Sequence, residues 1–111
     1  MSSNLVPEDI ARLKIMSKFF KGFADYSRLS ILRCLMEDSK TVSEIQTITG
    51  FSQPKISNHL KNLRDCELVV FEQDGKYVHY SIKDKRIKEI ILLAEVMLKD
   101  FSEENFYCMK Y

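Results

Sequence analysis

Apolar residues recur every three or four positions through four stretches of the chain before residue 66, and this spacing predicts four helices. The expected helices cover about residues 7–21, 26–36, 42–49 and 53–65. Thr41 and Ser52 are suitable caps for the third and fourth helices, and Gly50 is a suitable end for the third. The apolar positions that we expect to face inward in these two helices are Val42, Ile45, Ile48, Ile56, Leu60 and Leu63.

Two short stretches that follow, residues 68–71 and 76–82, are typical of strands. Asp74 and Gly75 between them favour a tight hairpin turn. Asp84 then begins a last helix, whose apolar positions are Ile87, Ile90, Ile91, Ala94, Met97 and Leu98. The order ααααββα predicts a mainly α protein with a β-hairpin wing, which is a winged helix-turn-helix, in a single domain over residues 1–111.

The composition mainly excludes other classes of protein. A chain of 111 residues that is 45% hydrophobic and 30% charged suits one soluble domain. No apolar run approaches the roughly 20 residues of a membrane span and no signal pattern opens the chain, so we expect a cytoplasmic protein. Three widely spaced cysteines argue against a disulfide framework. No motif for nucleophilic, metal-hydrolytic or phosphate-loop chemistry is present, so an enzyme is not expected.

The helix over residues 53–65 carries polar side chains on the face that its apolar stripe does not occupy. Asn and Gln can bond to adenine, and Lys can reach guanine or a phosphate. Such a face, next to a Gly-centred turn and a hairpin, predicts sequence-specific binding to double-stranded DNA. The candidate DNA-binding residues are Gln53, Lys55, Ser57, Asn58, His59 and Lys61 on the helix and Lys76 at the hairpin. In the competing interpretation these side chains only face water, and His59 packs or bonds to backbone.

Three sequence runs resemble the ArsR/SmtB family of bacterial winged-helix transcriptional repressors. They are FADYSRLSIL, ISNHLKNLRDCELV and, at the hairpin, EQDGKYVHYSI, and the similarity spans about residues 10–98. The resemblance implies a homodimer that pairs through the first and last helices, with a short tail from about residue 100. It also implies operator DNA that is released when an inducer binds. The first and last helices do carry apolar residues beyond what one small domain can cover.

The family's inducer sites differ by branch. One branch places a thiolate pair where this chain has Thr41 and Ser43. Another binds zinc in the last helix, at positions that here read Asp84, Arg86, Met97 and Asp100. Arg and Met cannot supply the nitrogen ligands that zinc prefers, so the resemblance implies that both of these sites are absent.

Locally the chain is closest to the CmtR-type cadmium/lead-sensor branch, which uses two cysteines four residues apart near the end of the recognition helix and a third from the partner's tail. Cys66 stands at the second position, Asn62 at the first, and Cys108 matches the tail. We therefore expect Cys66 and Cys108 to form the metal or redox site, with a soft metal ion such as cadmium or lead, or an oxidant, as the signal. No cofactor is expected for DNA binding itself.

The sequence thus predicts a homodimeric repressor with a thiol-directed signal. Cys34, which follows Leu32 in an apolar run, is expected to be a small buried hydrophobe. Two alternatives stay open: a repressor without an inducer site, and a winged helix used as a protein-interaction module. The polar recognition face argues against the second, because a protein-docking face should carry exposed apolar anchors.

Overall fold

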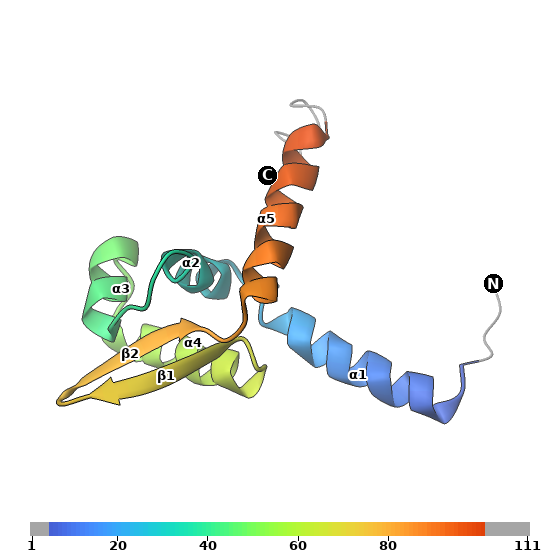
Figure 1. Cartoon of the computed structure of the whole chain (residues 1–111), viewed down its shortest axis with the longest axis horizontal. Coiled ribbons are helices and arrows are strands. Elements are labelled where there is room, and N and C mark those ends of the chain that lie inside the picture. Colours follow the sequence, from blue (N-terminus) through green and yellow to red (C-terminus); the bar gives the residue numbers. More distant parts are fainter. Residues whose placement is uncertain (1–4, 102–111) are drawn as a thin grey trace.

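The computed structural model describes residues 5–101. Its elements are α1 (Pro7–Lys21), α2 (Tyr26–Cys34), α3 (Val42–Thr49), α4 (Gln53–Asp65), β1 (Val69–Asp74), β2 (Tyr77–Ile82) and α5 (Lys85–Asp100). The predicted order ααααββα is confirmed, and the hairpin lies beside the α3–α4 pair as a wing (Figure 1). Among the described residues, no helix is both long and apolar enough to cross a membrane.

The core lies where α2, α3 and α4 meet the base of the hairpin. The fully buried side chains are Ile31, Leu32, Leu35, Ile45, Ile56, Leu60, Leu63 and Leu68. The predicted stripe of α4 is therefore confirmed: Ile56, Leu60 and Leu63 are each at most 1% exposed. Because burial of one such side chain stabilises by about 1.5–3 kcal/mol, this cluster fixes α4 firmly in place.

The turn from α3 into α4 is set by the residues predicted to cap it. Thr41 and Glu44 form a capping box, in which the Thr41 hydroxyl accepts from the Glu44 N–H at 3.2 Å and the Glu44 carboxylate accepts from the Thr41 N–H at 2.9 Å. Gly50 ends α3 in the left-handed region with φ +76°, and the Ser52 hydroxyl accepts from the Lys55 N–H at the start of α4. These local contacts determine where α4 begins.

The wing is an antiparallel hairpin that pairs Val69 with Ile82 at its base and Asp74 with Tyr77 at its tip. The first strand therefore continues past Phe71, and the turn is Gly75–Lys76, so both predicted limits were wrong. Gly75 takes the first central position with φ +61°, as a type II′ turn requires. The strand end was missed because the tip is exposed on both faces, which leaves no alternation of apolar and polar residues to detect.

The wing is also attached to the helical core by one backbone bridge. The Lys40 N–H donates to the Tyr80 carbonyl at 2.9 Å, and the Tyr80 N–H donates to the Lys40 carbonyl at 2.8 Å. This pair joins the loop between α2 and α3 to the middle of β2, and so fixes the wing relative to the helix pair.

Two further predictions need correction. Ile48 is 58% exposed, because two steps of three residues turn it about 120° away from Val42 on a helix of 3.6 residues per turn. The helix α2 ends at Cys34 rather than at Met36. Its last turn tightens, since the Leu35 and Met36 N–H groups bond to carbonyls three residues back.

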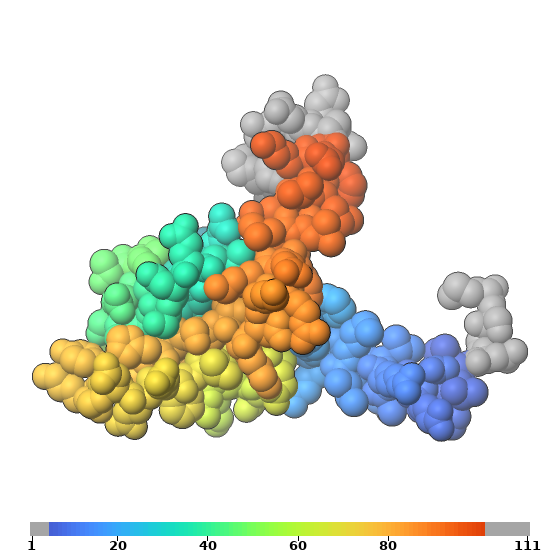
Figure 2. All heavy atoms as spheres, viewed as in Figure 1, coloured from blue at the N-terminus to red at the C-terminus, as the bar shows by residue number. Residues whose placement is uncertain are grey.

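The helices α1 and α5 project from the body as two arms (Figures 1 and 2). No residue of α1 is buried, although Leu13, Met16 and Phe20 are about half exposed apolar side chains on it. The radius of gyration is 16.5 Å, against about 13 Å for a compact domain of this length. Both arms therefore leave apolar surface that this chain alone does not cover.

Candidate DNA interface and signal site

The outer face of α4 is the candidate DNA-reading surface. Gln53, Lys55, Ser57, Asn58 and Lys61 are all exposed, while the buried stripe on the opposite side holds the helix against the core. Asn58 and Lys61 are three residues apart, which places them as neighbours on one side of the helix. The arrangement presents amide, hydroxyl and ammonium groups together, as the reading of base edges and phosphates requires.

Lys55 lies at one edge of this surface rather than in its centre. Its Nζ atom is 4.1 Å from the centroid of the Phe51 ring, so the ammonium rests on the aromatic face of the residue before the cap. An exposed cation–π contact is worth only about 0.5–1 kcal/mol. A phosphate or a base can therefore compete for this side chain at small cost.

His59 is placed differently from the other candidates. It is half-buried, and its Nδ1 atom is buried without a hydrogen-bond partner among the described residues. Asp25, the cap of α2, is near enough to respond to it. The Arg28 N–H, donating at 3.1 Å, is the main cause that lowers the pKa of Asp25, and the charge of His59 adds to it. DNA contact by His59 therefore stays a prediction, and its half-buried ring is less accessible than the other candidates on α4.

At the wing, Lys76 is exposed in the turn, with Nζ 5.4 Å from the Tyr77 ring centroid. Gln73 is committed to the turn, because its Nε2 donates to the Gly75 carbonyl at 3.2 Å. Lys76 is thus the cation in the turn, two residues after Asp74 in the sequence.

One contact that joins the wing to α4 was missed by the sequence analysis. The Arg64 guanidinium lies 4.4 Å from the centroid of the Phe71 ring on β1. A cation seven residues before an aromatic ring, across a helix end, has no periodic signal in the sequence. The contact ties the far end of the reading helix to the hairpin.

Cys66 is the C-terminal cap of α4 and is half-buried next to the core. Asn62, four residues earlier, is half-buried too, and it lines the same surface hollow. The prediction for Cys108 concerns a residue outside the described range. Within residues 5–101, no three side chains of His, Cys, Asp or Glu converge as a metal site.

Cys34 lies half-buried against the core, and burial raises the pKa of its thiol. It is therefore protonated at neutral pH, and a thiol is a poorer nucleophile and metal ligand than a thiolate.

The two other family sites hold different chemistry here. The Asp84 carboxylate caps α5 and bonds to the Arg86 guanidinium at 2.7 and 3.0 Å. The side-chain and backbone bonds from Arg86 lower the pKa of Asp84 to about 2. Thr41, at the thiolate position of another branch, uses its hydroxyl to cap α3. Thr41 and Asp84 are therefore both N-terminal caps of helices in this chain.

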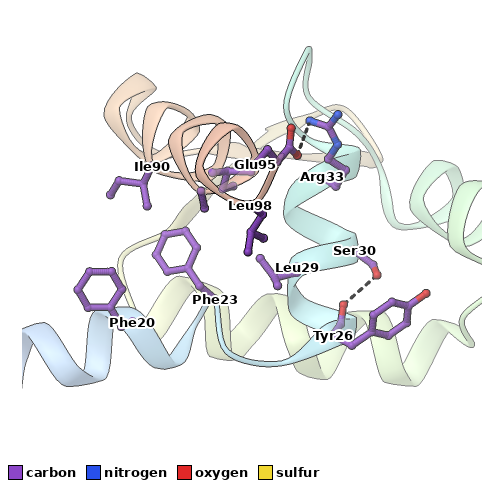
Figure 3. Close-up of a pocket in the computed structure, with 11 residues that line it drawn as sticks. Phe20, Phe23, Tyr26, Leu29, Ser30, Arg33, Ile90, Glu95 and Leu98 are labelled. Carbon is purple, nitrogen blue, oxygen red and sulfur yellow. Dashed lines mark hydrogen bonds and ion pairs between the residues drawn. The ribbon is translucent and has the colours of Figure 1, made fainter. Parts of the chain in front are cut away.

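A groove of about 510 Å³ opens between the end of α1, the helix α2 and the helix α5 (Figure 3). Its walls are mainly apolar, with Phe20 and Phe23 on one side and Ile90 and Leu98 on α5. At its rim an ion pair of 3.3 Å between Arg33 and Glu95 joins α2 to α5. The groove continues the exposed apolar surface of the two arms.

Comparison with known proteins identifies the family. Residues 25–70 match the arsR family of bacterial regulatory proteins. A probable mercury resistance operon repressor from Streptomyces lividans is 36% identical over 84 residues, which cover 76% of this chain and 67% of that protein. An uncharacterized helix-turn-helix regulator from Methanocaldococcus jannaschii is 39% identical over 80 residues, which cover 71% of this chain and 90% of that protein.

Solved structures agree with this result. A homodimeric winged helix-turn-helix DNA-binding domain from Mycobacterium bovis superposes with a TM-score of 0.78 at 25% identity, covering 86% of this chain and 89% of that one. NolR from Sinorhizobium fredii superposes with a TM-score of 0.76 at 29% identity, covering 86% and 96%. From its sequence and its winged helix-turn-helix, the chain belongs to the arsR family of bacterial regulatory proteins.

Proposed function

We propose that this protein is a transcriptional repressor that binds a specific operator as a homodimer and releases it on a thiol-directed signal. The observation that carries the proposal is the exposed polar face of α4, held by a buried stripe within a helix-turn-helix that has a wing beside it. Membership of a family of regulatory proteins supports a regulator rather than an enzyme.

DNA reading is assigned to the exposed residues of α4, with Asn58 at the centre. Its amide can bond to both hydrogen-bonding atoms of an adenine edge, and the nearby Ser57 and Lys61 can hold a base or a phosphate. Lys55 and Gln53 flank the first turn, and Lys76 contacts the backbone from the wing. His59, which is half-buried, completes the set with the part of its ring that is exposed.

The homodimer is supported by the two arms. On α5, Leu93 is 60% exposed and Val96 54%, and on α1 Ile15 is 71% exposed. The relative from Mycobacterium bovis is a homodimer. A second copy that covers α1 and α5 makes a two-fold reader, whose operator has two half-sites about one helical turn apart.

The signal is assigned to Cys66, at the end of the reading helix, together with Cys108. Relatives with 31–37% identity include repressors or regulators of mercury, cadmium and arsenical resistance, from Streptomyces lividans, Listeria innocua and Bacillus subtilis. A thiophilic metal ion such as mercury, cadmium or lead, or an oxidant that bonds at Cys66, would favour a different position of α4. Coupling of about 1–3 kcal/mol, or roughly 5–150-fold in operator affinity, is typical.

The test begins with duplexes selected from a random library by the reduced protein, because the operator sequence must first be obtained. Operator affinity is then measured with and without each soft metal ion and a mild oxidant. We expect release in the parent and in Cys34→Ser, and no release in Cys66→Ser or Cys108→Ser.

Two results would contradict parts of this proposal. Release that persists in both Cys66→Ser and Cys108→Ser would place the signal elsewhere. A reduced protein that selects no duplex, at any salt concentration, would support an interaction module instead of a DNA reader.

A further inference from the structure

Cys66 lies in the wall of an open hollow of about 510 Å³ at the junction of α1, the start of α2 and the end of α4. Polar and apolar surface contribute equally to its lining, whereas the groove between α2 and α5 is almost entirely apolar. Four cationic side chains line it, namely Lys18 and Lys21 from α1, Arg28 from α2 and Arg64 from α4. The site therefore brings the junction of α1 and α2 together with the end of α4, which is distant in the sequence.

The charge of this hollow is positive. Its four cations face only two carboxylates, Asp65 and Glu67. Glu67 is already occupied, because it forms an ion pair with Lys83, and this partner is the main cause that lowers the pKa of Glu67. The cations thus exceed the carboxylates by two before Lys83 is counted.

The Arg28 guanidinium has a hydrogen-bond donor that is not used within the described residues. Its Nη1 donates to the Lys21 carbonyl at 3.0 Å, which fixes the guanidinium at the junction of α1 and α2. Its Nε is buried, and no acceptor for it is present in residues 5–101. A buried donor without a partner costs free energy, and the oxygen of an anion would satisfy it.

We propose that this hollow selects an anionic effector for Cys66: a low-molecular-weight disulfide that carries carboxylate groups. The inference rests on the proposed thiol signal and names the chemical class of its ligand. The cations attract and orient the carboxylates, and the reacting sulfur is brought to the Cys66 thiol. A cationic disulfide of similar size is disfavoured by the same charges.

The step is a thiol–disulfide exchange. The Cys66 thiol loses its proton to solvent, and the thiolate attacks one sulfur of the disulfide. The sulfur–sulfur bond of the effector breaks, a mixed disulfide with Cys66 forms, and the second half leaves as a thiolate that takes up a proton. Cys66 is oxidised, the leaving half is reduced, and no other oxidant is needed. The adduct then occupies the space between α1 and the end of α4.

The experiment uses a protein in which Cys66 is the one reactive thiol, made by Cys34→Ser and Cys108→Ser. Its rate of modification is measured with 5,5′-dithiobis(2-nitrobenzoate), a dianion, and with cystamine, a dication. The same rates are measured after Lys18→Gln with Lys21→Gln, and after the matched control Lys88→Gln with Lys99→Gln, which changes charge on α5, an element that does not line the hollow. Because each reagent is compared with itself, their intrinsic reactivities cancel.

We expect the hollow variant to lower the rate with the dianion by about tenfold at low salt, and to leave the rate with cystamine unchanged or higher. The control pair should change both rates little, and added salt should reduce the difference between parent and hollow variant. Equal effects of the two lysine pairs, or equal effects on the two reagents, would overturn the proposal.

The proposed function is tested separately by operator binding of Cys34→Ser, which keeps both Cys66 and Cys108, before and after its reaction with each disulfide. If Cys66 prefers the dianion but the modified protein still holds its operator, the hollow is confirmed and the thiol signal fails. If modification releases the operator without any charge preference, the thiol signal is supported and the anionic effector is refuted.

Discussion

The residue that follows the end of α4, Glu67, has a backbone conformation that is unfavourable for any residue with a side chain. This position allows a specific prediction of stability. Glu67 has φ +66° and is the one residue other than glycine with a positive φ among the described residues. The Leu68 N–H bonds to the Leu63 carbonyl at 2.9 Å, so the left-handed conformation is required to close the helix. Glycine is the residue that adopts this conformation without steric cost.

The comparison of Glu67→Gly with Glu67→Ala isolates the backbone, because both variants lack the carboxylate and its ion pair with Lys83. A side chain in the left-handed region costs about 1–2 kcal/mol. Against this, glycine gives the unfolded chain more conformational entropy, which destabilises the folded Gly variant by about 0.4–1 kcal/mol relative to the Ala variant. We therefore expect the Gly variant to be more stable than the Ala variant by about 1 kcal/mol, the reverse of the order inside a helix.

The assay is urea unfolding at one fixed protein concentration, since a dimer's stability depends on concentration. With a slope of about 2 kcal/mol/M, the midpoints should differ by about 0.5 M. A variant Glu67→Gln measures the loss of the charge alone. An Ala variant as stable as the Gly variant would refute the strained helix end.

Three further predictions concern packing, capping and assembly. Gly22→Ala should destabilise by about 1–3 kcal/mol, because its Cβ would overlap the buried Leu68 side chain; an unchanged urea midpoint would contradict this. Because the pKa of Asp84 is lowered to about 2, its ionised form stabilises the fold fully above its usual value near 4, and that contribution is lost as the pH falls toward 2. Asp84→Asn should therefore lower the melting temperature at pH 7 and have little effect at pH 2. Leu93→Glu, at a 60% exposed site on α5, should give a monomer by sedimentation, and a dimer of unchanged affinity would place the interface elsewhere.

The parts of the fold that sequence alone predicted are those set by contacts within a few residues. The stripe of Ile56, Leu60 and Leu63 follows the helical period, and the caps Thr41 and Ser52 act on N–H groups three residues away. Both patterns involve residues of a single helix and its cap, so they could be recognised from the sequence, and the helix pair and its turn were placed correctly. The wing's tip lacked such a signal, and its limits were misplaced.

The surroundings of the candidate site were harder to predict than the helices, because side-chain positions there depend on residues distant in the sequence. The Lys55 ammonium rests on the Phe51 ring, and the Nδ1 atom of His59 is buried, and both facts follow from how α4 packs rather than from any spacing in the sequence. The cations around Cys66 come from three helices, and no spacing along the chain reveals them.

The role proposed for the outer face of α4 is to read the operator, and the direct measurement of that role is the affinity of Asn58→Ala for the selected duplex. The matched control is Lys85→Ala, an exposed position on α5, and the measurement is fluorescence anisotropy at about 0.15 M salt, where long-range charge effects are largely screened. We expect a loss of about 1–3 kcal/mol, or roughly 5–150-fold in affinity, with relaxed specificity at one base pair and an unchanged circular dichroism spectrum. Operator affinity and specificity equal to the parent's in Asn58→Ala, and again in Lys55→Ala, would show that a different surface enters the groove.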